Sequence, residues 1–382
     1  RHTGASSDAV TLATYGTCTA KITNNLSNRN LIINGAMQVS QRGTSQSYAH
    51  DGTTQGYSLD RWMFYSSATD EWDWVISQDS SGPTGFSKSL KITTGTAESA
   101  VAADEYAYLN TRLEGIDLQS LGYGAGTAKA ATLSFWVKSS ITGTFGFTIY
   151  RGDTQDRVCN IPYAISSANT WEKKTISIPA DTSDGITDDN NARMRVTWAI
   201  LAGTNFTSSG ASSSWADYSS SGQYLAGHAQ NGVATTGSAT WYLTGVQLEV
   251  GDVATDFEHR SYGDEYLRCC RYYYRHTRPG KTYAAIGSAQ MYSDTAALGV
   301  VFFPTEMRYL PTVDSVTGTD YYQVVAGGDV DSCDRIILED SNDTCCGIRI
   351  DTNLSISSSQ GRGVYARLAN TSSGYLSFSA EL

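Results

Sequence analysis

Hydrophobic and polar residues alternate with a period of two along most of the chain, which is the pattern of strands with one buried face. The clearest examples are 132–137, in which Leu133, Phe135 and Val137 share one face, and 193–200. Further strands are predicted at 31–39, 62–65, 90–93, 144–150, 171–178 and 241–250. These strands are separated by turns rich in Gly, Ser and Asp, so they predict a two-sheet β-sandwich of the jelly-roll type.

A single segment, 261–280, has the pattern of a helix. Ser261 and Asp264 are spaced as an N-terminal cap, and Asp264 lies in the first turn while Arg275 lies in the last, which suits the helix dipole. Pro279 then ends the pattern. We expect this helix to link two domains.

The alternation returns after the helix, in a part of the chain that contains no Trp. Strands are predicted there at 298–303, 321–325, 335–338, 354–358, 364–368 and 376–380. The predicted fold class is therefore all-β, a jelly-roll β-sandwich followed by a smaller β-sandwich tip domain. The predicted boundaries are an N-terminal connector at 1–29, the jelly roll at 30–260, the linking helix at 261–280 and the tip domain at 281–382.

Composition narrows the classes of function. Charged residues make up 17% of the chain and the net charge is −11, so no basic surface is available for nucleic acid. The longest wholly apolar stretch, 296–303, is far shorter than the ~20 residues of a membrane span. The chain starts with Arg1 and has no signal peptide, so we expect an upstream segment to have been removed or left out.

The seven cysteines form no metal-binding or disulfide framework. Four of them lie in the adjacent pairs Cys269–Cys270 and Cys345–Cys346. Neighbouring Cα atoms are about 3.8 Å apart, closer than a relaxed disulfide allows. The pattern predicts free thiols and assembly in a reducing compartment.

No linear motif of a hydrolase or nucleotide-binding enzyme is present. An enzyme that cleaves glycans with two carboxylates would show no such motif, so a depolymerase remains an alternative. The acidic segment 181–191 provides a weak Ca²⁺ candidate in Asp184, Asp188 and Asp189, against the simpler interpretation of a solvated loop. No other cofactor is expected.

Four aromatic residues are candidates for stacking on sugar rings. Trp72 and Trp74 are predicted to share one face of a strand, and Trp215 and Tyr218 lie in the Ser- and Gly-rich stretch 208–240, where a simple linker would need no aromatic side chains. The alternative for any of these residues is packing in the core.

Several segments, in order, carry a resemblance to a known family. Segment 30–43 contains an Asn-Gly turn and a Gln-Arg-Gly, and 57–62 ends in Asp-Arg-Trp. The other matching stretches are 133–140, 169–172, 244–260, 272–274, 303–304, 307–308, 311–313 and 380–382. From residue 30 to the end, the chain resembles tail fibre proteins of tailed bacteriophages, especially those of marine and cyanobacterial phages.

The resemblance implies a virion tail appendage with a carbohydrate-binding-module-like jelly roll and a C-terminal tip domain. It implies a homotrimer that attaches to host cell-surface polysaccharide without covalent chemistry, and that joins other tail proteins through its N-terminal region. It implies neither nucleic-acid binding nor membrane insertion. The alternatives are a head or neck fibre or decoration protein, a glycan depolymerase tailspike, and a secreted cellular carbohydrate-binding module.

Overall fold

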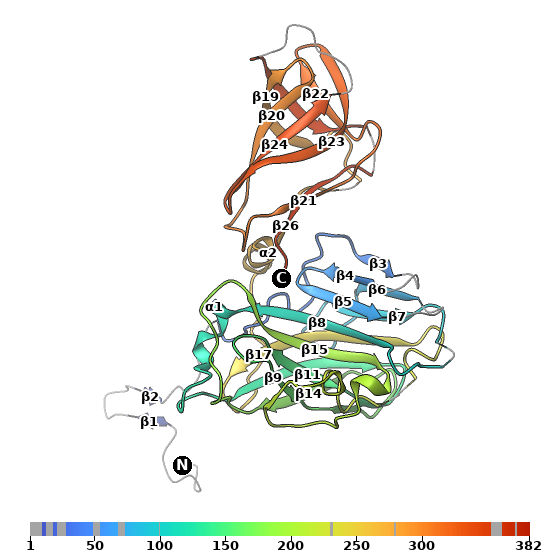
Figure 1. Ribbon diagram of the computed structural model, residues 1–382, viewed down its shortest axis with the longest axis vertical. Coiled ribbons are helices and arrows are strands. Elements are labelled where there is room, and N and C mark those ends of the chain that lie inside the picture. The colour runs from blue at the N-terminus through green and yellow to red at the C-terminus, as the bar shows by residue number, and fades with distance from the viewer. Residues whose placement is uncertain are drawn as a thin grey trace.

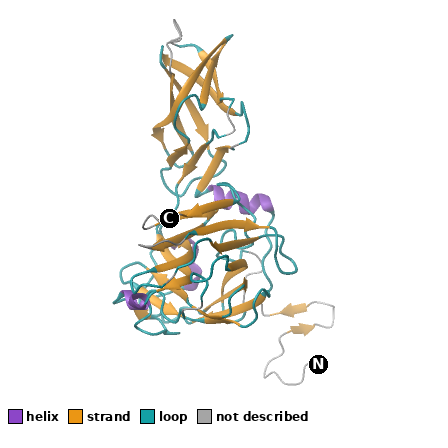
Figure 2. Cartoon of the chain, turned by 90° about the vertical axis from the view of Figure 1, so that its right-hand side faces the viewer, coloured by secondary structure: helices purple, strands orange, loops and turns teal. Residues whose placement is uncertain are grey.

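The chain folds into two β-rich bodies, one above the other (Figure 1). The computed structural model describes residues 10–12, 18–20, 28–48, 54–67, 73–98, 100–229, 232–278, 280–352, 361–370 and 373–382. Strands dominate both bodies, and the helix between them, α2 (Tyr262–Cys270), has nine residues (Figure 2). The predicted all-β class with a jelly-roll sandwich and one short linking helix is confirmed.

The larger body consists of two antiparallel sheets. The seven-stranded sheet has the order β16 (Ala216–Asp217), β12 (Arg157–Asn160), β11 (Phe147–Arg151), β15 (Ala192–Ala202), β8 (Tyr106–Glu114), β5 (Trp62–Ser67) and β4 (Thr54–Leu59). The six-stranded sheet has the order β14 (Glu172–Ile178), β9 (Ala131–Ser139), β17 (Thr240–Val250), β7 (Ser89–Thr94), β6 (Trp74–Asp79) and β3 (Ser45–Tyr48). Most of the strands predicted before residue 260 are among them.

Short elements complete the larger body and the N-terminal region. They are β1 (Val10–Leu12) paired with β2 (Cys18–Ala20), β10 (Gly143–Phe145) paired with β13 (Tyr163–Ile165), α1 (Gly115–Leu118), and the 3-10 turns η1 (Gln119–Leu121), η2 (Thr204–Phe206) and η3 (Ser221–Gln223). The last two lie within the Ser- and Gly-rich stretch or just before it, so that stretch is folded and is not a plain linker.

The core of the larger body lies between the two sheets and is rich in aromatic side chains. Trp62 and Trp198, from the seven-stranded sheet, have ring centroids 5.6 Å apart. Trp198 also meets Phe135 of the opposite sheet edge-on at 5.7 Å. All three side chains are fully buried. Burial of such large apolar surfaces is the main force that holds the two sheets together.

The segment 31–39 is a loop, although the sequence predicted a strand. Asn34 and Met37 have φ angles of 58° and 57°, which no strand accommodates. The Asn34 amide donates to the backbone oxygens of Val39 and Asp60, each at 2.9 Å. These side-chain bonds replace the ladder of a strand, so the buried apolar residues here fill the end of the sandwich without belonging to a sheet.

The linking helix is shorter than the sequence predicted. Its start is as expected, because the Ser261 hydroxyl accepts a hydrogen bond from the Asp264 backbone N–H at 3.1 Å. The helix ends at Cys270, however, and the next residues form the strand β18 (Tyr273–Thr277). This strand pairs with β26 (Leu376–Ser379), which also pairs with β21 (Thr312–Ser315). Pairing with a strand distant in sequence has overridden the local helical pattern.

The smaller body is a closed antiparallel barrel. Its strand order is β19 (Ala285–Ser293), β20 (Ala296–Phe302), β24 (Cys345–Thr352), β23 (Asp329–Ser341), β22 (Tyr322–Ala326) and β25 (Gly363–Leu368). The unit that the sequence predicted as a small sandwich is thus joined at its edges, which leaves no open sheet edge. The strand predicted at 354–358 lies outside the described residues.

Six cysteines of the described residues are free thiols, as the sequence predicted for the adjacent pairs. No helix of the described part is long and apolar enough to cross a membrane.

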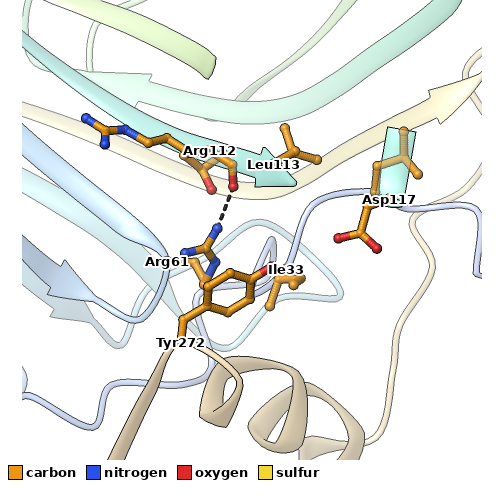
Figure 3. A pocket seen from close by; sticks show the side chains of 8 residues that line it. Ile33, Arg61, Arg112, Leu113, Asp117 and Tyr272 are labelled. Carbon is orange, nitrogen blue, oxygen red and sulfur yellow. Dashed lines mark hydrogen bonds between the residues drawn. The ribbon is translucent and has the colours of Figure 1, made fainter. Parts of the chain in front are cut away.

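A buried ionic cluster joins the two bodies at the place where the C-terminal segment returns to the sandwich (Figure 1). The carboxylate of Glu381 pairs with Arg61 and, at 3.2 Å, with Arg42. Figure 3 shows the Arg61 guanidinium against the ring of Tyr272 and directed at the backbone oxygen of Arg112. Arg61 is 2% exposed, so these partners stabilise its positive charge in place of water.

Further contacts reinforce the junction. Arg271 binds the buried carboxylate of Glu114 through two nitrogens, at 2.9 and 2.7 Å. The Asn190 amide donates to the backbone oxygen of Arg308 at 2.7 Å, and Arg308 donates to the backbone oxygen of Asn190 at 3.1 Å. The two bodies are therefore linked by directional polar bonds in addition to the covalent chain.

Glu381→Gln tests this junction. The substitution leaves the buried guanidinium of Arg61 without its carboxylate, and breaking one side of a buried ion pair costs about 3–5 kcal/mol. We expect a loss of this size in urea denaturation. The matched control is Glu339→Gln, whose partner Arg349 is 35% exposed, and for which the expected loss is below about 1 kcal/mol. Equal losses in both variants would contradict the role of the Glu381 pair.

Candidate functional site

The outer face of the seven-stranded sheet carries a row of tyrosines. Along β8, Ala107 and Leu109 point into the core, so Tyr106 and Tyr108 point to the opposite face. Tyr65 of β5 lies directly across from Tyr108 in the ladder. Since these three side chains come from adjacent strands and the same face, the sheet itself brings them together.

The three rings are nearly parallel. The planes of Tyr65 and Tyr108 differ by 3° with centroids 5.2 Å apart, and those of Tyr65 and Tyr106 differ by 10° with centroids 5.5 Å apart. Phe206 adds a fourth ring, with its centroid 4.3 Å from that of Tyr106. The arrangement is a rigid aromatic surface whose ring orientations are set by mutual packing.

The stretch that follows β15 builds the wall of a groove over these rings. Phe206, Tyr218 and Tyr224 come from this stretch, and it is held down by backbone hydrogen bonds from Leu225 to Phe206 at 3.0 Å and from Tyr218 to Asp156 at 2.8 Å. The groove has a volume of about 350 Å³. Its lining consists of Tyr65, Tyr106, Tyr108, Arg112, Arg195, Phe206, Tyr218 and Tyr224.

Polar side chains occupy the floor beside the tyrosines. Arg112 of β8 and Arg195 of β15 are direct partners in the ladder, and so are Asn110 and Thr197. Asn110 is fully buried, and neither its amide nitrogen nor its amide oxygen has a hydrogen-bond partner among the described residues. The Thr197 hydroxyl is in the same condition. Buried polar atoms are normally satisfied, so these two side chains have capacity to bind a buried water beneath the groove.

The groove carries no negative charge of its own. All of its lining residues are described, and none is an acid. Burial raises the pKa of Tyr106 and of Tyr108 above the usual value of a phenol, so both hydroxyls stay protonated. The nearby acid Asp156 is hydrogen-bonded to Tyr150, whose pKa is raised by burial and by this carboxylate. The groove can therefore offer hydroxyl donors and two guanidinium groups.

The structure describes three of the four predicted aromatic candidates and places them in different environments. Tyr218 lines the groove. Trp215 is partly buried, and its ring nitrogen donates to the backbone oxygen of Pro179 at 2.8 Å, so it fastens the loop. Trp74 is 1% exposed and packs edge-on against Phe64 in the core. Trp72 lies outside the described residues.

The three predicted Ca²⁺ ligands do not converge. Asp189 accepts hydrogen bonds from Arg193, which lower the pKa of its carboxyl group to about 2. Asp184 lies 3.6 Å from Arg151, and Asp188 is exposed. Within the part of the chain that the structure describes, no group of three or more His, Cys, Asp or Glu side chains is arranged to hold a metal ion.

Most of the groove residues were not singled out from the sequence. Tyr65, Tyr106, Tyr108 and Arg195 became candidates only when their strands were placed side by side. A usable signal exists in β8, where Tyr106 and Tyr108 alternate with Ala107 and Leu109. It identifies a strand with one aromatic face, but not which face is buried.

Comparisons with known proteins yield remote likenesses. No protein-family model matches the sequence, and no curated protein does. Among solved structures, a domain of tailspike protein 4 from bacteriophage CBA120 is similar, at 13% identity over 58% of this chain, with a TM-score of 0.29. A family 11 carbohydrate-binding module from Clostridium thermocellum matches at 13% identity over 56% of this chain and 98% of its own, with a TM-score of 0.27.

A third similar structure is a xylan-binding CBM22-1 domain from Paenibacillus barcinonensis. It matches at 15% identity over 55% of this chain and 95% of its own, with a TM-score of 0.25. The match to the tailspike covers 21% of that longer chain. At this distance none of the three assigns a role to the protein.

A buried histidine anchors the wall of the groove. His228 packs against Phe145 with ring centroids 5.9 Å apart, and its Nδ1 accepts a hydrogen bond from the Gly146 backbone N–H at 3.2 Å. A Cβ on Gly146 would lie 2.9 Å from the His228 side chain, so only glycine allows this approach. Burial lowers the pKa of His228 from 6.5 to about 4.

This pKa predicts how stability changes with pH. Between pH 6.5 and about 4 the unfolded chain binds a proton at His228 that the native protein does not. Stability from this residue is thus complete above pH 6.5 and is lost as the pH falls, by about 3 kcal/mol in total. We expect His228→Gln to remove this part of the slope in urea denaturation at pH 4–7. His259→Gln, at an exposed residue, should keep it, and an unchanged slope in His228→Gln would refute the assignment.

Proposed function

We propose that the protein is a phage tail fibre that attaches to host cell-surface glycan through the tyrosine-lined groove. The observation that carries this proposal is the pair of parallel, partly exposed rings of Tyr65 and Tyr106, backed by the buried ring of Tyr108, on the floor of an open groove. Flat aromatic faces bind the C–H faces of sugar rings, and polar groups beside them bind the sugar hydroxyls. The groove combines both features.

The geometry suits a sugar polymer better than a compact ligand. The row of groove residues crosses several strands, from Tyr65 on β5 through Tyr108 on β8 to Arg195 on β15. Tyrosine rings bear a hydroxyl at one end, so each ring can stack and also donate a hydrogen bond. Orphaned amide and hydroxyl groups of Asn110 and Thr197 lie on the same face.

We propose that attachment involves no covalent chemistry. Cleavage of a glycosidic bond generally uses two carboxylates on either side of the scissile bond. The groove lining contains arginines, tyrosines and one phenylalanine, and no carboxylate. This composition favours binding over hydrolysis.

The assembly that we propose is a homotrimer joined to other tail proteins through residues 1–29. Large hydrophobic side chains are exposed mainly on the barrel and at its base, which is typical of a surface that another chain covers. They are Tyr283, Tyr292, Val300, Phe302, Tyr309, Leu310, Val330 and Tyr365. Three grooves on one fibre would raise the avidity for a repeating glycan by about 10² or more.

The molar mass in solution tests the assembly. Light scattering on the eluted peak of a sizing column should give about three times the 41.2 kDa of one chain at micromolar concentration. Phe302→Ser, at a side chain that is 74% exposed, should shift the mass towards that of one chain. A single species of 41.2 kDa would refute the trimer and leave the groove's function untouched.

Removal of the tyrosines tests the groove. Each ring contributes about 1 kcal/mol or more to stacking, so Tyr65→Ala and Tyr106→Ala should each weaken binding to purified host polysaccharide about tenfold. The measurement is titration calorimetry, together with adsorption to host cells. Incubation of the protein with the same polysaccharide should release no new reducing ends.

The matched control is Tyr262→Ala, which removes a ring that is 56% exposed on the linking helix, away from the groove lining and from the proposed trimer surface. It should bind and adsorb like the unaltered protein. If the double variant Tyr65→Ala and Tyr106→Ala keeps full adsorption while its melting temperature is unchanged, the groove is not the attachment site.

A further inference from the structure

Arg195 is half-buried and, like its ladder partner Arg112, has no acidic side chain as an ion-pair partner among the described residues. Others in the same body do: Arg61 pairs with Glu381, Arg151 and Arg157 pair with Asp181, Arg260 pairs with Glu258 and Glu265, and Arg271 pairs with Glu114. For Arg195 no acidic oxygen of the described residues lies within ion-pair distance. Its neighbours are the rings of Tyr150 and Tyr224, at 5.4 and 5.9 Å.

The hydrogen bonds of Arg195 leave part of its guanidinium without a partner. Nη1 donates to the hydroxyl of Tyr224 at 2.6 Å. Nε is shielded from solvent and has no partner among the described residues. A guanidinium can bind a carboxylate through its remaining N–H donors. Since Arg195 lines the groove, an anion in the groove can meet this side chain.

The electrostatic surroundings keep this positive charge uncompensated. The two acids on the adjoining strand ends are already engaged, Asp156 with the hydroxyl of Tyr150 and Asp217 with Arg157. Burial raises the pKa of Tyr150 and of Tyr108 above the usual value of a phenol, so neither hydroxyl supplies a negative charge. A guanidinium that has lost much of its hydration without gaining a counter-ion is costly, and a counter-ion brought by the ligand would recover that cost.

We propose that the groove selects an anionic glycan, and that a carboxylate or sulfate of the sugar binds the guanidinium of Arg195. This inference rests on the proposed function, since it names the class of glycan that the groove takes. The rings of Tyr150 and Tyr224 lie 5.4 and 5.9 Å from the guanidinium, so an acidic sugar bound there would have aromatic contacts next to its ionic one. The chain as a whole has a net charge of −11, and it would otherwise repel an acidic polymer.

The experiment compares acidic glycans with uncharged forms of the same backbones. The carboxylate arm uses polygalacturonate, alginate and hyaluronan, each with its methyl ester, and the sulfate arm uses carrageenan and its desulfated form. We expect at least one acidic polymer to bind about tenfold more tightly than its uncharged form, because a charge-assisted pair exceeds a neutral hydrogen bond by that order. The arm in which the preference occurs identifies the anion.

Arg195→Gln should lower the ratio of acidic to uncharged affinity from about ten to about one, whatever its effect on binding of the uncharged form, and Arg195→Lys should restore part of that ratio. The control is Arg335→Gln, at a side chain 61% exposed on the barrel. The preference of the unaltered protein for the acidic polymer over its uncharged form is a test that needs no variant. This preference should diminish as the salt concentration is raised.

The experiment distinguishes a failure of the Arg195 assignment from a failure of the proposed glycan attachment. If uncharged forms bind as tightly as acidic ones, or if only uncharged forms bind, selection by Arg195 is wrong and glycan attachment stands. If the preference persists in Arg195→Gln, the anion binds elsewhere, and the assignment to Arg195 is also wrong. If neither these polymers nor purified host polysaccharide bind at all, the proposed function fails together with the inference.

Discussion

The strands of the seven-stranded sheet must satisfy two environments at once, because their side chains alternate between the core and the groove. On β15, Val196 packs inward while Arg195 faces the groove, and on β8 the same division separates Leu109 from Tyr108. A shift of the pairing by one residue would exchange the two sets and place a guanidinium in the core. The burial of Trp198 against the rings of the opposite sheet therefore fixes the register on which the groove depends.

The wall of the groove shows how a segment poor in hydrophobic residues can still fold. Between residues 208 and 240 the chain is mostly Ser, Gly, Ala and Thr, and it is held by a few buried side chains and many backbone bonds. Leu225 is fully buried, and the Asn160 backbone N–H donates to the oxygen of Ser212 at 2.8 Å. Because the aromatic residues of the wall are positioned before a ligand arrives, binding need not order them, and this lowers its entropic cost.

The sequence predicted the fold better than the site. Strands such as 132–137 and 193–200 were found because a buried apolar face alternates with a polar one. Strand β8 was missed because Tyr106 and Tyr108 are themselves apolar enough to hide the alternation. The same ambiguity made Trp74 a candidate, since an aromatic residue in a strand can face either side of the sheet. Tyr218 could be singled out because no strand pattern explained it. The isolation of Arg195 from acids is a property of three strands brought together, and no linear pattern contains it.

Arg112 connects the groove to the junction of the two bodies. Its side chain lines the groove opposite Arg195, while its backbone oxygen accepts a hydrogen bond from Arg61, which the Glu381 carboxylate holds in place. One end of the groove is thus built on the same strand residue as the ionic cluster that fastens the barrel. Since buried ion pairs tolerate little displacement before their partners are left uncompensated, the barrel and the groove keep a constant relation. A displacement of the barrel would therefore reach the groove through this short path of contacts.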